Sequence, residues 1–115
     1  MEMAVRDKHT FKIVDVIGKI DRLKDSITLK SFMLSLIEEG AKKVALNLAN
    51  ITYLDSGALN VFIFGNNALK KSGGSLCIIE PNEYVMDVLE VVGLTKLIPV
   101  YPTEADFDKG ESAKK

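Results

Sequence analysis

The chain is organised around residues 43–71, KVALNLANITYLDSGALNVFIFGNNALKK. The apolar run over 44–48 predicts a strand, residues 49–54 a turn, and residues 58–71 a long, mostly apolar helix. Asp55, Ser56 and Gly57 lie where the loop after the strand becomes the helix. Backbone N–H groups without helical partners and the positive end of the helix dipole meet at such a point. We therefore expect a charge placed there to interact with these N–H groups and with the helix dipole.

Composition and charge bound what the chain can be. It has 115 residues, a net charge of −1 and a hydrophobic fraction of 47%, which is enough to fill the core of one domain. Lys and Arg are not in excess and Trp is absent, so nothing indicates a nucleic-acid surface or a polybasic membrane patch. Charges interrupt the first seven residues, and no apolar run is long enough to span a bilayer. We expect a soluble, cytoplasmic protein that does not insert into membranes.

The scarcity of cysteine and histidine excludes several chemistries. Cys77 is the only cysteine, which rules out an intrachain disulfide and a cysteine-rich zinc site, and its apolar neighbours indicate a buried thiol. His9 is the only histidine and lies in an expected hairpin turn, so most Ser–His and Cys–His mechanisms are excluded. We expect a protein that is not an enzyme and needs neither a cofactor nor a metal.

The rest of the chain alternates between strand and helix patterns. The predicted elements are a hairpin over 3–17 that turns at 7–10, a helix that begins at Asp25 or Ser26 and ends at Gly40, a strand over 76–79, a helix over 83–92, an edge strand over 97–101 and a short capped turn over 103–106. Strand–helix units at this spacing imply parallel pairs, and the hairpin adds an antiparallel one. The prediction is a single α/β domain over 1–108, with a mixed four- to five-stranded sheet packed with three to four helices and a flexible polar tail over 109–115.

The helix over 58–71 has more apolar surface than one contact with a sheet requires. Leu59, Phe62, Ile63 and Leu69 form one plausible core stripe, whereas Val61 and Phe64 lie on another face with Gly57 and Asn60. Two interpretations remain open. The second face is covered by another element, or it is a docking surface with Ser56 at its edge.

Several motifs in order resemble the STAS domain, the fold of bacterial anti-sigma factor antagonists. They are Gly18-Lys19-Ile20-Asp21, the strand over 44–48, Ile51 to Leu59, Gly93 to Leu97, and the ending Tyr101 to Asp106. The similarity covers about residues 4–107. The family usually reads Asp-Ser-small-Gly-Leu-Gly, so this chain departs from it with an early glycine, Gly57, and with Asn60 in place of the second glycine.

The resemblance implies a partner-switching mechanism. An unphosphorylated antagonist binds an anti-sigma factor that is also a serine kinase, and a serine phosphatase restores the binding form after phosphorylation. By position the phosphorylated residue is Ser56, and Asp55, Asp21 and Gly57 form its surroundings. Three residues of the same helix, Asn60, Val61 and Phe64, are the expected partner-binding positions. A phosphate on Ser56 is expected to act at the interface rather than to unfold the domain, because a dianion is tolerated at a helix N-terminus.

Other interpretations of the same residues stay open at this point. Asp55 and Ser56 suit plain helix capping. An acid/base and nucleophile pair at these two residues lacks a nearby histidine, and Asp21 with Asp55 is a thin basis for a metal site. The nearer alternative is a STAS scaffold subunit of a stress-signalling or lipid-transport complex that uses the same helix face without phosphorylation.

Overall fold

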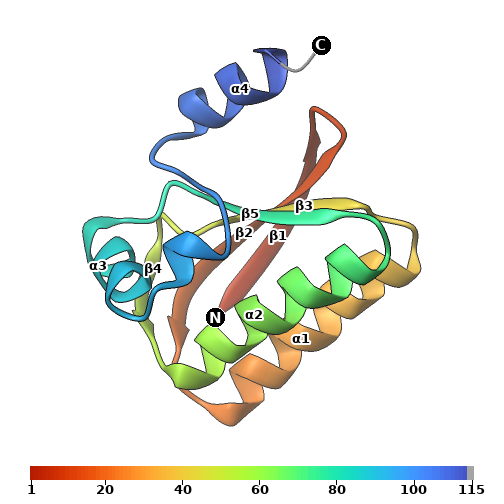
Figure 1. Ribbon diagram of the computed structural model, residues 1–115. Coiled ribbons are helices and arrows are strands. Elements are labelled where there is room, and N and C mark those ends of the chain that lie inside the picture. Colours follow the sequence, from red (N-terminus) through yellow and green to blue (C-terminus); the bar gives the residue numbers. More distant parts are fainter. Residues whose placement is uncertain (114–115) are drawn as a thin grey trace.

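The computed structural model describes residues 1–113, which form a mixed six-stranded sheet with helices on both faces (Figure 1). The strands are β1 Glu2–Lys8, β2 Phe11–Ile20, β3 Lys43–Asn47, β4 Ile51–Leu54, β5 Ser75–Ile79 and β6 Val100–Tyr101. The helical elements of these residues are α1 Leu23–Glu38, α2 Ser56–Lys71, α3 Glu83–Val91, the 3-10 turn η1 Leu94–Lys96 and α4 Glu104–Ala113. The predicted α/β class and mixed sheet are confirmed, with β4 as an additional short strand.

The strand order brings the segments that lead into α1 and α2 to the same end of the sheet. The order is β1-β2-β3-β5-β6, with β4 beside the C-terminal part of β2. Only β1 and β2 are antiparallel among the described pairs, and they are joined by the predicted hairpin, in which His9 and Thr10 have φ of 51° and 73°. The carboxyl ends of β2 and β4 therefore lie together, and the segments that lead into α1 and α2 begin there.

Helices α1 and α2 lie side by side on one face of the sheet and close the main core (Figure 1). Two glycines of α2 allow this close contact. A Cβ at Gly57 would lie 2.7 Å from the Ser26 Oγ, and one at Gly65 would collide with the Met33 methyl group. On the second face of α2, α1 thus packs close to Gly57 and leaves Val61 only 5% exposed, whereas Asn60 stays exposed and Phe64 half-buried.

Helix α4 lies on the opposite face of the sheet (Figure 1). Its Phe107 is buried and packs edge-on against Phe11, with ring centroids 5.0 Å apart. At its first turn, the Glu104 carboxylate accepts hydrogen bonds of 2.6 and 2.7 Å from the Arg6 guanidinium. A further ion pair of 2.8 Å joins Glu104 to Lys8 on the same strand. Helix α4 is therefore held by an aromatic contact and by ion pairs to β1.

Several boundaries differ from the predictions. The edge strand predicted over 97–101 is only Val100–Tyr101, because Leu97 ends the 3-10 turn η1. Residues 51–54 form β4 rather than a turn, because Ile51 and Leu54 enter the core while the residues between them stay exposed, a pattern without strand alternation. Helix α1 begins at Leu23, so both predicted cap residues, Asp25 and Ser26, lie inside it, and Ser26 is buried against α2. The predicted domain boundary at 108 falls inside α4, so residues 109–113 of the expected tail are helical, and Glu111 is buried. Residues 114–115 of that tail lie outside the described residues.

Candidate functional site

The Asp-Ser-Gly element forms the N-terminus of α2. Asp55 is the N-cap residue, and its Oδ1 accepts a hydrogen bond of 3.0 Å from the Ala58 N–H. Ser56 is the first helical residue and its side chain is exposed. Capping is therefore the role of Asp55, whereas the Ser56 hydroxyl makes no hydrogen bond to residues 1–113 and is accessible.

Strand pairing brings Asp21 and Asp55 to the same edge. Ile20 and Leu54 are register partners in the parallel pair of β2 and β4, and the Asp55 N–H donates to the Ile20 carbonyl at 3.0 Å. Asp21 and Asp55 are the next residues after these partners, so both lie at the end of the β2–β4 pair where α2 begins, and their role around Ser56 stays a prediction. No cluster of three or more potential metal ligands is present among residues 1–113, so the two carboxylates stand without further ligands there.

Side chains of α3 hold the outer edge of β4, immediately before Ser56. The Tyr84 hydroxyl accepts from the Leu54 N–H at 3.2 Å and lies 3.4 Å from the Leu54 carbonyl, to which it donates. The Asn82 amide donates to the Ile51 carbonyl at 2.6 Å while its oxygen caps α3. These groups take the place of a neighbouring strand, because an edge strand otherwise leaves such backbone groups unpaired. The Asp-Ser-Gly element is therefore held from both sides of β4.

Two shallow apolar hollows flank the N-terminal half of α2. The α1–α2 hollow has a volume of about 240 Å³. Its lining includes Leu23, Ile27, Lys30, Asn60, Val61 and Phe64. The α2–α3 hollow has a volume of about 330 Å³. Its lining includes Ser56, Leu59, Asn60, Ile63, Val92 and Leu97. Ser56 thus lines the α2–α3 hollow directly.

The three predicted partner-binding residues differ in how far they are exposed. Asn60 is exposed and Phe64 is half-buried, with the Lys30 ammonium 4.4 Å from the centre of its ring. Val61 is only 5% exposed, because α1 packs over it, so it forms part of the wall of the α1–α2 hollow and offers little surface of its own. All three remain predictions as contact residues.

Sequence reasoning missed part of this surface. Leu23, Ile27, Val92 and Leu97 are large apolar residues that the structure leaves exposed around the two hollows. Tyr53 and Tyr84 form an exposed stack with ring centroids 6.4 Å apart beside β4. Their positions follow from tertiary packing. Of these exposed residues, only Leu23 and Ile27 could have been identified from the sequence. They lie before the predicted start of the helix or in its first turn, outside its apolar core stripe.

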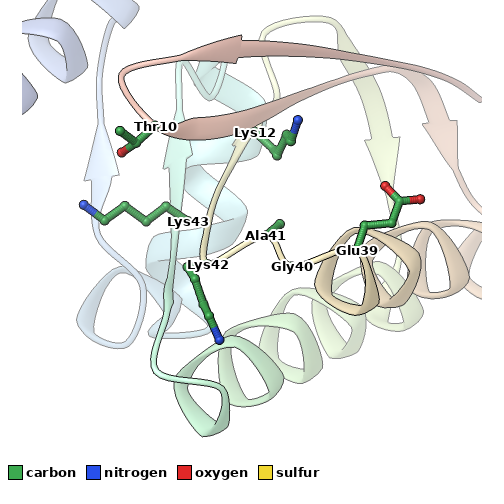
Figure 2. A pocket seen from close by; sticks show the side chains of 7 residues that line it. All are labelled: Thr10, Lys12, Glu39, Gly40, Ala41, Lys42 and Lys43. Atoms are coloured by element: carbon green, nitrogen blue, oxygen red, sulfur yellow. The ribbon is translucent and has the colours of Figure 1, made fainter.

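A third hollow, about 410 Å³ in volume and larger than the two beside α2, lies at the opposite end of the sheet (Figure 2). Figure 2 shows the side chains of Lys12, Lys42 and Lys43 pointing in different directions rather than toward a common point. Lys12 pairs with Asp7 at 2.7 Å, and the Lys42 ammonium donates to the Ser72 carbonyl at 2.6 Å. Lys12 and Lys42 are thus engaged by groups outside the hollow, and the Lys43 ammonium lies 5.7 Å from the centre of the Phe11 ring, so the three lysines do not form an anion cradle.

The family of the chain follows from comparison with known proteins. The STAS domain family model matches residues 2–107, and the chain therefore belongs to the STAS domain family. The anti-sigma-B factor antagonist of Bacillus subtilis is 30% identical over 87 residues, which cover 76% of this chain and 78% of that protein.

Two solved structures share the fold. An anti-sigma factor antagonist from Mycobacterium paratuberculosis has a TM-score of 0.81 at 20% identity, with 94% of this chain and 92% of that chain covered. The Bacillus cell fate determinant SpoIIAA in its phosphorylated form has a TM-score of 0.71 at 14% identity, with 94% of this chain and 98% of that chain covered. No helix within residues 1–113 is both long and apolar enough to cross a membrane.

Proposed function

We propose that this STAS domain is an anti-sigma factor antagonist whose partner is an anti-sigma factor with serine kinase activity. Phosphorylation of Ser56 releases the partner, and a serine phosphatase restores the binding form. The observation that carries the proposal is the position of Ser56, which is exposed in the first turn of α2 and lines an apolar hollow. The names of the relatives described above support the assignment to antagonists.

Binding, rather than catalysis, is the activity proposed for this chain. The kinase and phosphatase reactions belong to its partners, and the chain needs no cofactor or metal of its own. Its net charge of −1 does not suit a nucleic-acid partner. We place the protein in the cytoplasm, where the transcription machinery is, without insertion into a membrane.

The switch acts through the interface. A phosphate on Ser56 adds roughly −1.5 to −2 charges. The N-terminus of α2 tolerates this charge, but Asp55, whose carboxylate caps the same turn, opposes it. A partner that fills the α2–α3 hollow must remove water from the phosphate. Leaving such a group desolvated and unpaired costs several kcal/mol, on the order of a hundredfold or more in affinity.

The test begins with the protein purified from its own host, by intact mass and by tandem mass mapping of Ser56. The purified anti-sigma factor kinases of that host are then incubated with ATP and either the wild type, Ser56→Ala or Ser31→Ala. Ser31 is a matched control, because it is an exposed serine of α1. We expect one phosphate on the wild type and on Ser31→Ala, and none on Ser56→Ala. A stable complex that is never phosphorylated would instead favour a scaffold function.

A further inference from the structure

Asn60 lies between the two apolar hollows on the surface around Ser56. It lies on α2 one turn after Ser56, and its side chain is exposed. It lines both the α1–α2 hollow and the α2–α3 hollow, so it separates two apolar depressions. Within residues 1–113 its amide makes no hydrogen bond, so both its donor and its acceptor are available.

The surroundings of Asn60 are apolar and open. Leu23 and Ile27, beside the α1–α2 hollow, are 77% and 54% exposed. Val92 and Leu97, beside the α2–α3 hollow, are 51% and 41% exposed. A partner that buries both groups of side chains must also cover Asn60. Large exposed apolar clusters of this kind are typical of protein–protein contacts.

The two hollows differ in charge. Lys30 is the one charged residue that lines either hollow within the described chain, and its ammonium lies over the Phe64 ring. A carboxylate on the partner complements Lys30 at the α1–α2 side. The α2–α3 hollow has the exposed Ser56 in its lining and no charged lining residue, so it suits a neutral apolar group when Ser56 is unmodified. The two hollows are therefore chemically different, and Asn60 marks the boundary between them.

We propose that Asn60 determines which anti-sigma factor this protein accepts. The accepted partner inserts an apolar side chain into each hollow, places an acidic residue near Lys30 and presents a hydrogen-bonding group to the Asn60 amide. A partner that is apolar at that point leaves a buried amide without hydrogen bonds. The discrimination expected from one such unsatisfied group is about 5- to 100-fold in affinity. This inference rests on the proposed function and adds the chemistry that selects the partner.

The test is a titration of the anti-sigma factor kinase that phosphorylates this protein, with five forms of the chain: wild type, Asn60→Ala, Asn60→Ser, Asn67→Ala and Ser56→Asp. Asn67 is a matched control because it is an exposed asparagine of the same helix that lines neither hollow. We expect Asn60→Ala to bind about 5- to 100-fold more weakly, Asn60→Ser to recover part of the loss, and Asn67→Ala to bind like the wild type.

The outcomes separate the inference from the proposed function. Equal or tighter binding by Asn60→Ala, with weak binding by Ser56→Asp, overturns the role of Asn60 and leaves the switch intact. Unchanged binding by Ser56→Asp contradicts the switch itself. A purely structural role for Asn60 predicts a changed melting temperature with unchanged affinity. Alanine has a higher helix propensity than asparagine, so Asn60→Ala is expected to fold and to melt no lower than the wild type.

Discussion

Tyr84→Phe tests how much the Tyr84 hydroxyl stabilises β4. It removes the hydroxyl that lies 3.2 Å from the Leu54 nitrogen and 3.4 Å from the Leu54 oxygen, and it keeps the ring that stacks on Tyr53. Both bonds are near the long limit, so we assign the pair a net value of about 1 kcal/mol. That value corresponds to about fivefold faster opening of the segment immediately before Ser56.

Amide hydrogen exchange, followed residue by residue, measures this opening directly. We expect the Leu54 amide of Tyr84→Phe to exchange about fivefold faster, while amides in the centre of β3 change less. Tyr53→Phe is the matched control, because the Tyr53 hydroxyl makes no hydrogen bond to the described residues. An unchanged rate at Leu54 in Tyr84→Phe, or an equal increase in Tyr53→Phe, would refute the assignment of the hydroxyl as a substitute for a strand neighbour.

Three further predictions concern stability, each read from denaturant unfolding. Hydrogen bonds from Arg6 lower the pKa of Glu104 from 4.5 to about 2. The ionised carboxylate therefore contributes fully to the free energy of unfolding above about pH 4.5, and this contribution is lost as the pH falls through 2. With solvent screening, Glu104→Gln should destabilise by about 1 kcal/mol at pH 7 and by almost nothing at pH 2. Gly74→Ala should destabilise by about 3 kcal/mol, because its Cβ collides with the Lys42 backbone carbonyl. Asp55→Ala should destabilise by about 1 kcal/mol through loss of the α2 cap.

Each of these has a control within the chain. Glu90 is an exposed glutamate of α3, so Glu90→Gln is the matched control for Glu104→Gln. Gly73 has a φ of +84° and open space around it, so Gly73→Ala should cost only about 1 kcal/mol of backbone strain. A larger loss for Gly73→Ala than for Gly74→Ala would contradict the steric argument. Asp55→Asn retains an acceptor for the Ala58 N–H and should recover most of the stability lost in Asp55→Ala.

Periodicity and turn chemistry in the sequence were sufficient for most elements. The buried runs of β3 and β5 and the apolar stripes of α1 and α2 each identify their element, because burial on a fixed period leaves a pattern. Gly93 marks the end of α3 through its φ of 78°. The cap at the start of α4 was also predicted, and the Thr103 hydroxyl accepts from the Asp106 N–H at 3.0 Å.

The parts that could not be predicted depend on contacts between distant segments. Strand β4 has four residues without alternation, and it forms because β2 extends far enough to pair with it. Helix α4 extends to Ala113, beyond the predicted turn, and ion pairs from Lys8 to Glu104 and Asp108 join it to β1, which lies nearly the whole length of the chain away in sequence. The sequence alone indicated Ser56 and its acidic neighbours, but the hollows on either side of Asn60 exist only when α1, α2 and α3 are packed.

A pair of titrations measures directly whether phosphorylation of Ser56 releases the partner. The anti-sigma factor kinase of the host is titrated, without ATP, into the unmodified protein and into protein phosphorylated stoichiometrically on Ser56. We predict that phosphorylation raises the dissociation constant by at least about 100-fold, while the circular dichroism spectrum is unchanged. Equal dissociation constants, or tighter binding of the phosphorylated form, would contradict the account.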